Sequence, residues 1–252
     1  MKFTRKQIDR YSRQIILKKI GVAGQKKLLR SSVLIVGAGG LGSPIAIYLA
    51  ALGIGKIGVI DKDKVEISNL ARQIIFDTND INKKKSSVAI NKIKKINPDI
   101  KVKCFNKNLT RMNINQIAKN FDLLIDGSDN FRTRFLVNDY CFKNKKILIS
   151  GAISKFDGQV YTFNFNKKNS PCLRCFIPKM PNNPDVDNCE YDGVLGPLAG
   201  IIGSIQANEA VKEILKIGDT LCGYILVFNA LKLNFRKVKL NKRSDCYCNE
   251  KK

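Results

Sequence analysis

A glycine-rich turn is the clearest chemical signal in this sequence. Gly37, Gly39 and Gly42 follow the pattern G-x-G-x-x-G, after an apolar stretch at 33–36 and before a helical stretch at 43–52. The first glycine permits the tight turn, the second lets a phosphate approach the backbone, and the third allows close helix–strand packing. The N-terminus of a helix also attracts phosphate, because its N–H groups are free and carry partial positive charge. The turn therefore predicts nucleotide binding, with a purely structural glycine turn as the alternative.

Charged residues beyond the next strands indicate which nucleotide is bound. Asp61 ends the predicted strand at 57–60, where its carboxylate can accept hydrogen bonds from ribose hydroxyls. Arg72, Lys85 and Asp129 also follow strand ends, and ligands of open parallel sheets bind beyond the carboxyl ends of the strands. Two cations on phosphates and one carboxylate on Mg²⁺ suit a nucleoside triphosphate better than a dinucleotide. A dehydrogenase stays open as an alternative, although the chain lacks the histidine that often transfers its proton.

Two pairs of cysteines suggest a metal site. Cys172 and Cys175 form C-x-x-C in the segment PCLRC, and Cys246 and Cys248 form C-x-C near the C-terminus. Four thiolates in two pairs are typical of a structural, tetrahedral zinc site that ties the tail to the loop. A redox-active C-x-x-C is the rival interpretation. Because one spacer residue strains chelation by both tail sulfurs, Cys222 is a possible substitute ligand.

Three other cysteines call for separate interpretations. Cys189 lies in NCEYDGVLGP, within a long irregular segment, and is either a reactive thiol that takes up an acyl or sulfur group or an incidental loop residue. Cys104 and Cys141 fall in a strand pattern and a helix pattern, so we expect both in the core.

Composition bounds the function further. The 252 residues include 45 Lys+Arg, 21 Asp+Glu and no His, for a net charge of +24, which excludes every His-containing triad or metal site. The positive charge reflects either lysine-rich genomic bias or an acidic partner, and the lack of a basic stripe interleaved with aromatics disfavours nucleic acid. No apolar run reaches the about 18–20 residues of a membrane helix, and the charged start lacks the apolar stretch that a signal peptide has. We therefore expect no membrane contact, a cytoplasmic location and cysteines that are thiols or metal ligands.

The order of patterns predicts a single α/β fold. We expect a Rossmann-like, doubly wound, mostly parallel sheet with an antiparallel C-terminal extension and a zinc-tied tail. The expected segments are a helical arm at 1–30, a nucleotide-binding core at 31–165, and a crossover loop, helix, hairpin and zinc tail at 166–252, packed with the core as one domain. Beyond the glycine turn we expect strands at 100–105, 122–126, 146–150 and 156–166, helices at 84–96, 131–143 and 198–217, and a hairpin at 223–240.

Together these residues resemble the ThiF/MoeB/HesA family, the bacterial relatives of ubiquitin-activating enzymes. The resemblance runs from Tyr11 to the tail cysteines and rests on the joint order of YSRQ (11–14), GAGGLG (37–42), SNLARQ (68–73), DGSDN (126–130), GQ (158–159), PCLRC (171–175) and GVLGP (193–197). The family's second cysteine pair is usually C-x-x-C, so the C-x-C tail is a departure.

The resemblance implies a function. It is ATP-dependent adenylation of the C-terminal Gly-Gly carboxylate of a small ubiquitin-fold sulfur-carrier protein, with release of pyrophosphate. A sulfur donor, such as a cysteine desulfurase, then gives the thiocarboxylate for molybdopterin or thiamine biosynthesis. The chemistry needs no histidine, because the attacking carboxylate is already ionised and the step requires only alignment and charge neutralisation.

The resemblance also implies roles for individual residues and a homodimer whose contact includes the N-terminal arm. Arg13 reaches across the dimer into the neighbour's phosphate site, and Cys189 matches an acyl-accepting or sulfur-relay position. Arg72 and Lys85 act on phosphates, and Asp129 holds Mg²⁺. Cys172 and Cys175 match zinc ligands. The ATP-binding set is Gly37, Gly39, Gly40, Gly42, Asp61, Ser68, Asn69, Arg72, Lys85, Asp129 and Asn130.

Two functional alternatives remain on the same fold. One is an ATP-dependent enzyme that modifies tRNA, which the high positive charge would suit and which predicts salt-sensitive RNA binding. The other is a catalytically inactive nucleotide-binding scaffold, against which the joint presence of Arg72, Lys85 and Asp129 argues.

Overall fold

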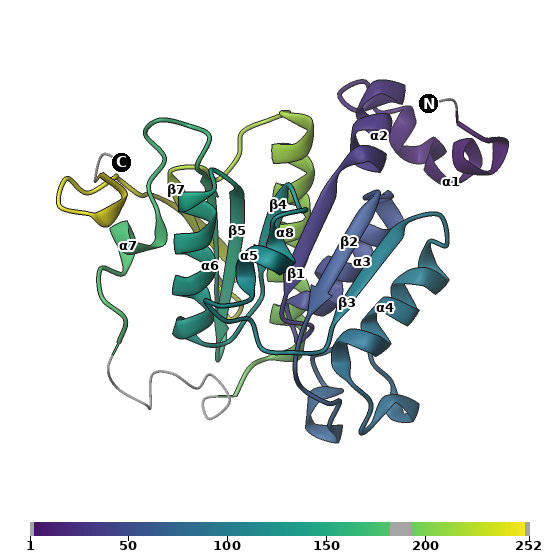
Figure 1. Cartoon of the computed structure of the whole chain (residues 1–252), viewed down its shortest axis with the longest axis horizontal. Coiled ribbons are helices and arrows are strands. Elements are labelled where there is room, and N and C mark those ends of the chain that lie inside the picture. Colours follow the sequence, from purple (N-terminus) through teal and green to yellow (C-terminus); the bar gives the residue numbers. More distant parts are fainter. Residues whose placement is uncertain (1–2, 182–192, 250–252) are drawn as a thin grey trace.

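One eight-stranded sheet organises the protein, as the computed structural model of residues 3–181 and 193–249 shows (Figure 1). Its spatial order is β3-β2-β1-β4-β5-β6-β7-β8. The strands from β3 to β5 are parallel, and β6, β7 and β8 continue the sheet antiparallel. The strands are β1 (Ser32–Val36), β2 (Lys56–Ile60), β3 (Lys101–Phe105), β4 (Leu123–Asp126), β5 (Ile147–Ser154), β6 (Asp157–Asn164), β7 (Tyr224–Asn229) and β8 (Asn234–Lys239).

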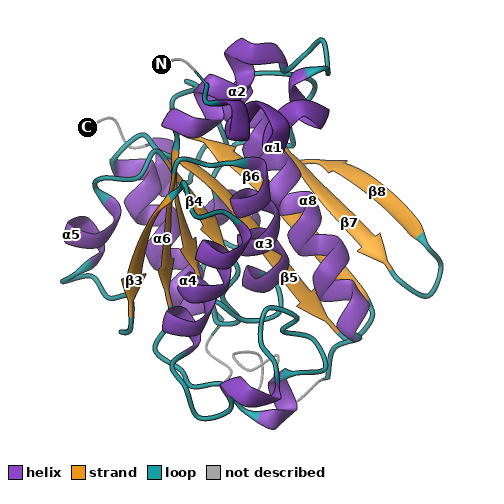
Figure 2. Cartoon of the chain, turned by 90° about the vertical axis from the view of Figure 1, so that its right-hand side faces the viewer, coloured by secondary structure: helices purple, strands orange, loops and turns teal. Residues whose placement is uncertain are grey.

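Helices cover both faces of the sheet (Figure 2). Side chains alternate across a strand, so Val33 and Ile35 of β1 enter one apolar core while Leu34 and Val36 enter the other. The first core includes residues of α3, α4 and α8, and the second includes residues of α5 and α6. The helices are α1 (Arg5–Ile15), α2 (Gly21–Arg30), α3 (Gly42–Leu52), α4 (Lys85–Ile96), α5 (Ile114–Ala118), α6 (Phe131–Lys143), α7 (Leu173–Phe176) and α8 (Gly196–Leu215).

The N-terminal arm, formed by α1 and α2, lies at the end of β1 opposite the glycine turn (Figure 1). A capping box between Thr4 and Gln7 starts α1. Tyr11 is fully buried, and its hydroxyl accepts a hydrogen bond of 2.9 Å from Nδ2 of Asn97. A Cβ on Gly53 would lie only 2.7 Å from the Tyr11 ring, so the docked arm requires glycine at this position.

The observed fold confirms the predicted α/β class with its antiparallel extension. The helices predicted at 84–96 and 131–143 are α4 and α6, and the hairpin predicted at 223–240 contains β7 and β8. β5 extends to Ser154, beyond the predicted end at 150, because β6 pairs with it along its whole length. The described residues contain no helix long and apolar enough to span a membrane.

One core prediction was wrong. Cys104 is exposed, whereas Cys141 is fully buried as expected. The reason is topological, because β3 is an edge strand and three of its five residues are exposed. An apolar strand pattern does not reveal whether a second strand or helix covers it.

Candidate active site

The glycine turn joins β1 to α3 at the carboxyl edge of the parallel strands. Gly37 has φ +90°, and a Cβ there would lie 3.0 Å from the carbonyl oxygen of Gly127 on the neighbouring loop. A Cβ on Gly42 would lie 2.0 Å from the carbonyl oxygen of Gly37, a contact too short for any side chain. The first and third glycines therefore have the conformational and packing roles that the motif predicts.

Asp61 follows β2 and holds the turn in place. Its Oδ2 accepts a hydrogen bond of 2.8 Å from the N–H of Ala38, and its Oδ1 accepts one of 2.8 Å from the N–H of Asp63. Burial raises the pKa of the Asp61 carboxyl, while these two backbone donors act in the opposite direction. Its carboxylate thus links the glycine turn to the segment after β2, where Asp63 faces Lys85.

A first group of polar side chains lies on the β2–α4 side of the pocket. Lys85 begins α4 and is buried, with its Nζ 4.0 Å from Oδ2 of Asp63. Arg72 donates to the carbonyl oxygen of Ser68 at 3.2 Å, through one of its nitrogens. Gln73 is only 3% exposed, and no hydrogen-bond partner for its Oε1 exists among the described residues. A buried oxygen of this kind at a pocket wall is able to accept a hydrogen bond from a ligand.

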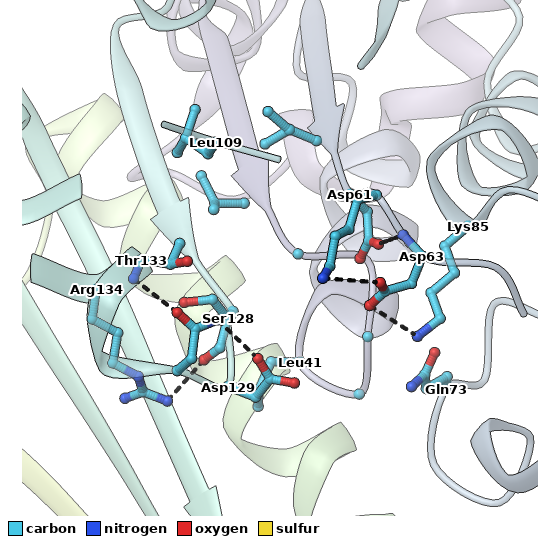
Figure 3. A pocket seen from close by; sticks show the side chains of 18 of the residues that line it. Leu41, Asp61, Asp63, Gln73, Lys85, Leu109, Ser128, Asp129, Thr133 and Arg134 are labelled. Atoms are coloured by element: carbon cyan, nitrogen blue, oxygen red, sulfur yellow. Dashed lines mark hydrogen bonds and ion pairs between the residues drawn. The ribbon is translucent and has the colours of Figure 1, made fainter. Parts of the chain in front are cut away.

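A second group lies across the pocket, on the loop between β4 and α6 (Figure 3). Asp129 is exposed, and its Oδ1 accepts from Nδ2 of Asn130 at 3.2 Å. The side chain of Asn130 caps α6 by accepting from the N–H of Thr133 at 2.9 Å. Arg134 is buried and donates to the carbonyl oxygen of Ser128 at 2.8 Å. In total, five basic and three acidic side chains line the pocket. This excess of positive charge suits a polyphosphate.

The pocket brings together most of the residues that the sequence singled out. Those at its wall are Gly37, Gly39, Gly40, Asp61, Arg72, Lys85, Asp129 and Asn130. Ser68 and Asn69 lie outside this wall, and the Asn69 side chain is buried, where it accepts from the N–H of Glu66 at 3.2 Å. Arg13 is exposed on α1, at the opposite end of the sheet (Figure 1), and Cys189 lies outside the described residues.

Several wall residues had no assigned role in the sequence interpretation. Gln73 was inside the motif SNLARQ and could have been found there, because it follows Arg72 directly. Ser128 and Val194 likewise lie in the motifs DGSDN and GVLGP. The others lie outside the quoted motifs, on loops, a helix and a strand: Lys62, Asp63, Lys107, Asn108, Leu109, Thr133, Arg134 and Ile153.

A second site lies away from the pocket, at the tail. The Sγ atoms of Cys172, Cys175, Cys246 and Cys248 all lie within 4.8 Å of one another, and all four residues are buried. The Sγ–Sγ distances are 3.6 Å for Cys172–Cys246, 3.5 Å for Cys175–Cys248 and 4.0 Å for Cys172–Cys175. Four sulfurs at about 2.3 Å from a tetrahedral zinc would stand about 3.8 Å apart, so this cluster fits zinc.

The C-x-C spacing is accommodated because each tail cysteine faces a different loop cysteine. Tyr247, between them, packs its ring 5.3 Å from that of Phe142 in α6. Cys222 is not part of the cluster and lies 3.8 Å from Oγ of Ser170. The hydrogen bond between Cys172 and Cys175 lowers the pKa of Cys175 and raises the pKa of Cys172, so a thiolate at Cys175 is stabilised by the neighbouring thiol.

Fold and site together define a nucleotide-binding α/β protein with a Rossmann-like turn. The scan against known families matches the ThiF family over residues 11–249. The chain therefore belongs to the ThiF family, as its motifs indicated.

Three similar proteins indicate the class of enzyme to which this chain belongs. The chain is 43% identical to a sulfur carrier protein adenylyltransferase of Thermus thermophilus, over 98% of this chain and 92% of that protein. It is 47% identical to a probable molybdopterin-synthase adenylyltransferase of Porphyra purpurea and 44% identical to the adenylyltransferase and sulfurtransferase MOCS3 of Aedes aegypti. It spans only 62% and 56% of those two longer proteins. The chain is an adenylyltransferase, the enzyme class that the sequence predicted.

Solved structures agree on the fold. The E. coli MccB structure with ATP matches 96% of this chain and 75% of its own, at a TM-score of 0.82 and 23% identity. A structure of PaaA matches 96% of this chain and 76% of its own, at a TM-score of 0.81 and 22% identity.

Proposed function

We propose that this protein uses ATP to adenylate the C-terminal Gly-Gly carboxylate of a small ubiquitin-fold sulfur-carrier protein. The observation that carries the proposal is the meeting of Arg72, Lys85 and Asp129 around the glycine turn in one pocket. The name of the Thermus thermophilus relative supports a sulfur carrier as the substrate. The product is then used in molybdopterin or thiamine biosynthesis. The carrier protein that the enzyme accepts decides between these two pathways.

The reaction is an in-line displacement at the α-phosphorus of ATP. A carboxylate oxygen of the carrier forms the new P–O bond, the bond to the β-phosphate oxygen breaks, and pyrophosphate leaves with that electron pair. No proton has to move, because the carboxylate is ionised at neutral pH. The protein's task is to align the two anions and to offset their charge.

Basic residues of the pocket perform that task. Lys85 is buried, and within the described part of the chain it has one ion pair, at a long 4.0 Å, so its ammonium is available to a phosphate. The guanidinium of Arg72 donates to the Ser68 carbonyl oxygen through one nitrogen and retains further donors for the β- and γ-phosphates. Asp61 and Gly40 adjoin the nucleoside, where the remaining lone pairs of Asp61 can accept from ribose hydroxyls.

Asp129 would hold Mg²⁺ at the loop between β4 and α6. Its carboxylate oxygens are the ligand type that Mg²⁺ prefers, and it is the acidic side chain of this loop that is open to the pocket. The ion, when bound, would neutralise charge on the phosphates of ATP.

The four-cysteine cluster would hold Zn²⁺ in a structural role. All four positions of a tetrahedral site are filled by protein sulfurs, so no position is left for a substrate. The site would tie the tail to the α7 loop, as the sequence suggested.

We further infer a homodimer in which Arg13 of one subunit completes the phosphate site of the other. Arg13 is exposed on α1 and lies far from its own pocket, and α1 and the adjoining turn also expose Ile8, Ile16 and Leu17. Apolar exposure on a small element is typical of a contact surface.

The remaining parts of the proposal concern sulfur delivery and location. A donor such as a cysteine desulfurase would supply the sulfur, with Cys189 as an acyl-accepting or relay thiol. A cytoplasmic location accords with the free thiols of the described residues, because disulfides persist mainly in oxidising compartments.

The test is ATP–pyrophosphate exchange, measured with each Gly-Gly-ending small protein of the organism added separately. We expect exchange only with a cognate carrier, and none with a carrier that lacks its last two glycines. Magnesium-dependent ATP binding without exchange for any carrier would contradict the proposal. Salt-sensitive tRNA binding in that case would favour the RNA-modifying alternative, and its absence would favour the scaffold.

A further inference from the structure

A second aspartate of the motif DGSDN has no place in the mechanism above. Asp126 ends β4 and is fully buried beneath the pocket. Its Oδ1 accepts from both the N–H and the Oγ of Ser128, at 3.0 Å and 2.6 Å. Its Oδ2 accepts from Oγ of Ser150 on β5, at 2.8 Å. No basic side chain of the described residues forms an ion pair with it.

The backbone around Asp126 is fixed as well. Its carbonyl oxygen accepts from Nε2 of Gln206 in α8, at 2.9 Å. The N–H of Gly127 donates to the carbonyl oxygen of Val36 on β1, at 2.9 Å. Strand, helix and loop therefore all hold the chain just before Asp129.

Asp129 itself has little to hold it. Among the described residues, its carboxylate accepts one hydrogen bond, from Nδ2 of its chain neighbour Asn130. Figure 3 shows Asp129 and Ser128 on the same loop, with Arg134 bonded to that loop from α6. The direction of the Asp129 side chain thus depends on the peptide that precedes it, which is the peptide of Ser128.

We propose that Asp126 is a positioning residue, which fixes the Ser128 peptide and thereby aims the Asp129 carboxylate at the metal and phosphates. The proposal rests on the proposed role of Asp129 in holding Mg²⁺. A buried carboxylate without a cation is costly, and well-packed apolar residues usually give more stability than buried charge. Here three donors converge on the carboxylate, and two of them belong to the residue next to Asp129.

The geometry separates hydrogen bonding from charge as the source of the effect. In Asp126→Asn the amide oxygen can still accept from Ser128, because the Ser150 hydroxyl can reverse and accept from the new NH₂ group. In Asp126→Glu the charge is kept, but the added methylene displaces the acceptor. In Asp126→Ala the N–H of Ser128 loses its acceptor altogether.

The opposite end of β4 supplies a matched control. Oδ2 of Asp122 accepts from the N–H and Oγ of Ser32, at 2.9 Å and 2.8 Å. Asp122 directly precedes β4, so Asp122→Ala removes an aspartate–serine contact of the same chemistry at the far end of that strand, outside the pocket wall.

The experiment measures Mn²⁺ binding by electron paramagnetic resonance, in the full-length protein with a non-hydrolysable ATP analogue, together with the Mg²⁺ dependence of ATP–pyrophosphate exchange. We expect the metal concentration for half-saturation to rise about 10-fold or more in Asp126→Ala and Asp126→Glu. It should change less than about 3-fold in Asp126→Asn and Asp122→Ala. KM for ATP at saturating metal should change much less than the metal requirement.

The outcomes distinguish this proposal from the function on which it rests. Asp129→Ala is measured first, and an unchanged metal requirement there would reject the magnesium role itself. If Asp129→Ala weakens metal binding while Asp126→Ala and Asp126→Glu do not, the positioning role is wrong. If Asp126→Ala does not fold, Asp126→Glu alone decides in the same way. A loss in Asp126→Asn without a loss in Asp126→Glu would assign the effect to charge and also overturn the proposal.

Discussion

The pocket and the cysteine cluster both adjoin helix α6, but at different points along it, and their side chains are arranged in opposite ways. The pocket is lined by side chains from many elements, its charges are of mixed sign, and Asp129 stands open to it. The cluster consists of four identical side chains from two short segments, all buried. An open ligand set leaves room for a substrate, whereas a closed one holds only its own ion.

Helix α6 connects the two regions. Its first turn is capped by Asn130 beside Asp129. In its middle, Asp139 receives two hydrogen bonds from Arg174, at 2.9 Å and 2.7 Å, and Oδ1 of Asn138 accepts from the N–H of Leu173 at 2.9 Å. The comparison teaches that reactivity and stability can share one scaffold helix while their residues remain separate.

The largest effect is expected in the pocket. Asp129→Ala should lower ATP–pyrophosphate exchange about 1000-fold, because the phosphates lose the proposed metal anchor. Since Asp129 is exposed, its loss should leave the melting temperature nearly unchanged. Normal exchange in this variant would remove Asp129 from the site.

The next largest effect is expected in the cysteine cluster, where stability should fall and activity should be kept. Cys172→Ser should reduce zinc from one ion per chain to none and lower the free energy of unfolding by about 3 kcal/mol or more. Elemental analysis and denaturant titration measure the two changes. Exchange per folded molecule should be largely kept, and metal-free protein of full stability would refute the structural role.

A third prediction concerns whether the pocket is complete within one chain. Arg13→Ala should lower exchange about 100-fold. Mixing it with Lys85→Ala should restore about a quarter of the wild-type activity, because half of the random dimers contain one intact site. No recovery in dimers shown to exchange subunits would argue against the contribution of Arg13 across the interface.

The smallest effect concerns the link between the regions. Arg174→Lys should cost about 1 kcal/mol of stability, because lysine cannot reproduce the paired hydrogen bonds to Asp139. ATP affinity should not change. A large loss of ATP affinity, measured by calorimetry, would show that the two regions are coupled more strongly than their separate side chains indicate.

Much of the fold and of the pocket was predictable, because it follows from local patterns. The glycine turn, the strand ends at Asp61 and Asp126, and the helix after Asn130 are each encoded within a few residues. Arg134 and Lys107 were not assigned to the pocket, because a helix interior and a loop give no local sign of which cavity they face. Cys104 was misplaced for the same reason, since the edge position of β3 is a property of the whole sheet.

The sequence by itself determined the family, the glycine-rich turn and the residue types available to both sites. Only the tertiary structure decided that Cys246 joins Cys172 and that Cys248 joins Cys175, and that Asp126 lies buried beneath Asp129. The physical reason is the range of the interactions. Turns and caps depend on neighbours along the chain, whereas a metal cluster and a buried carboxylate depend on the register and order of strands that are distant in sequence.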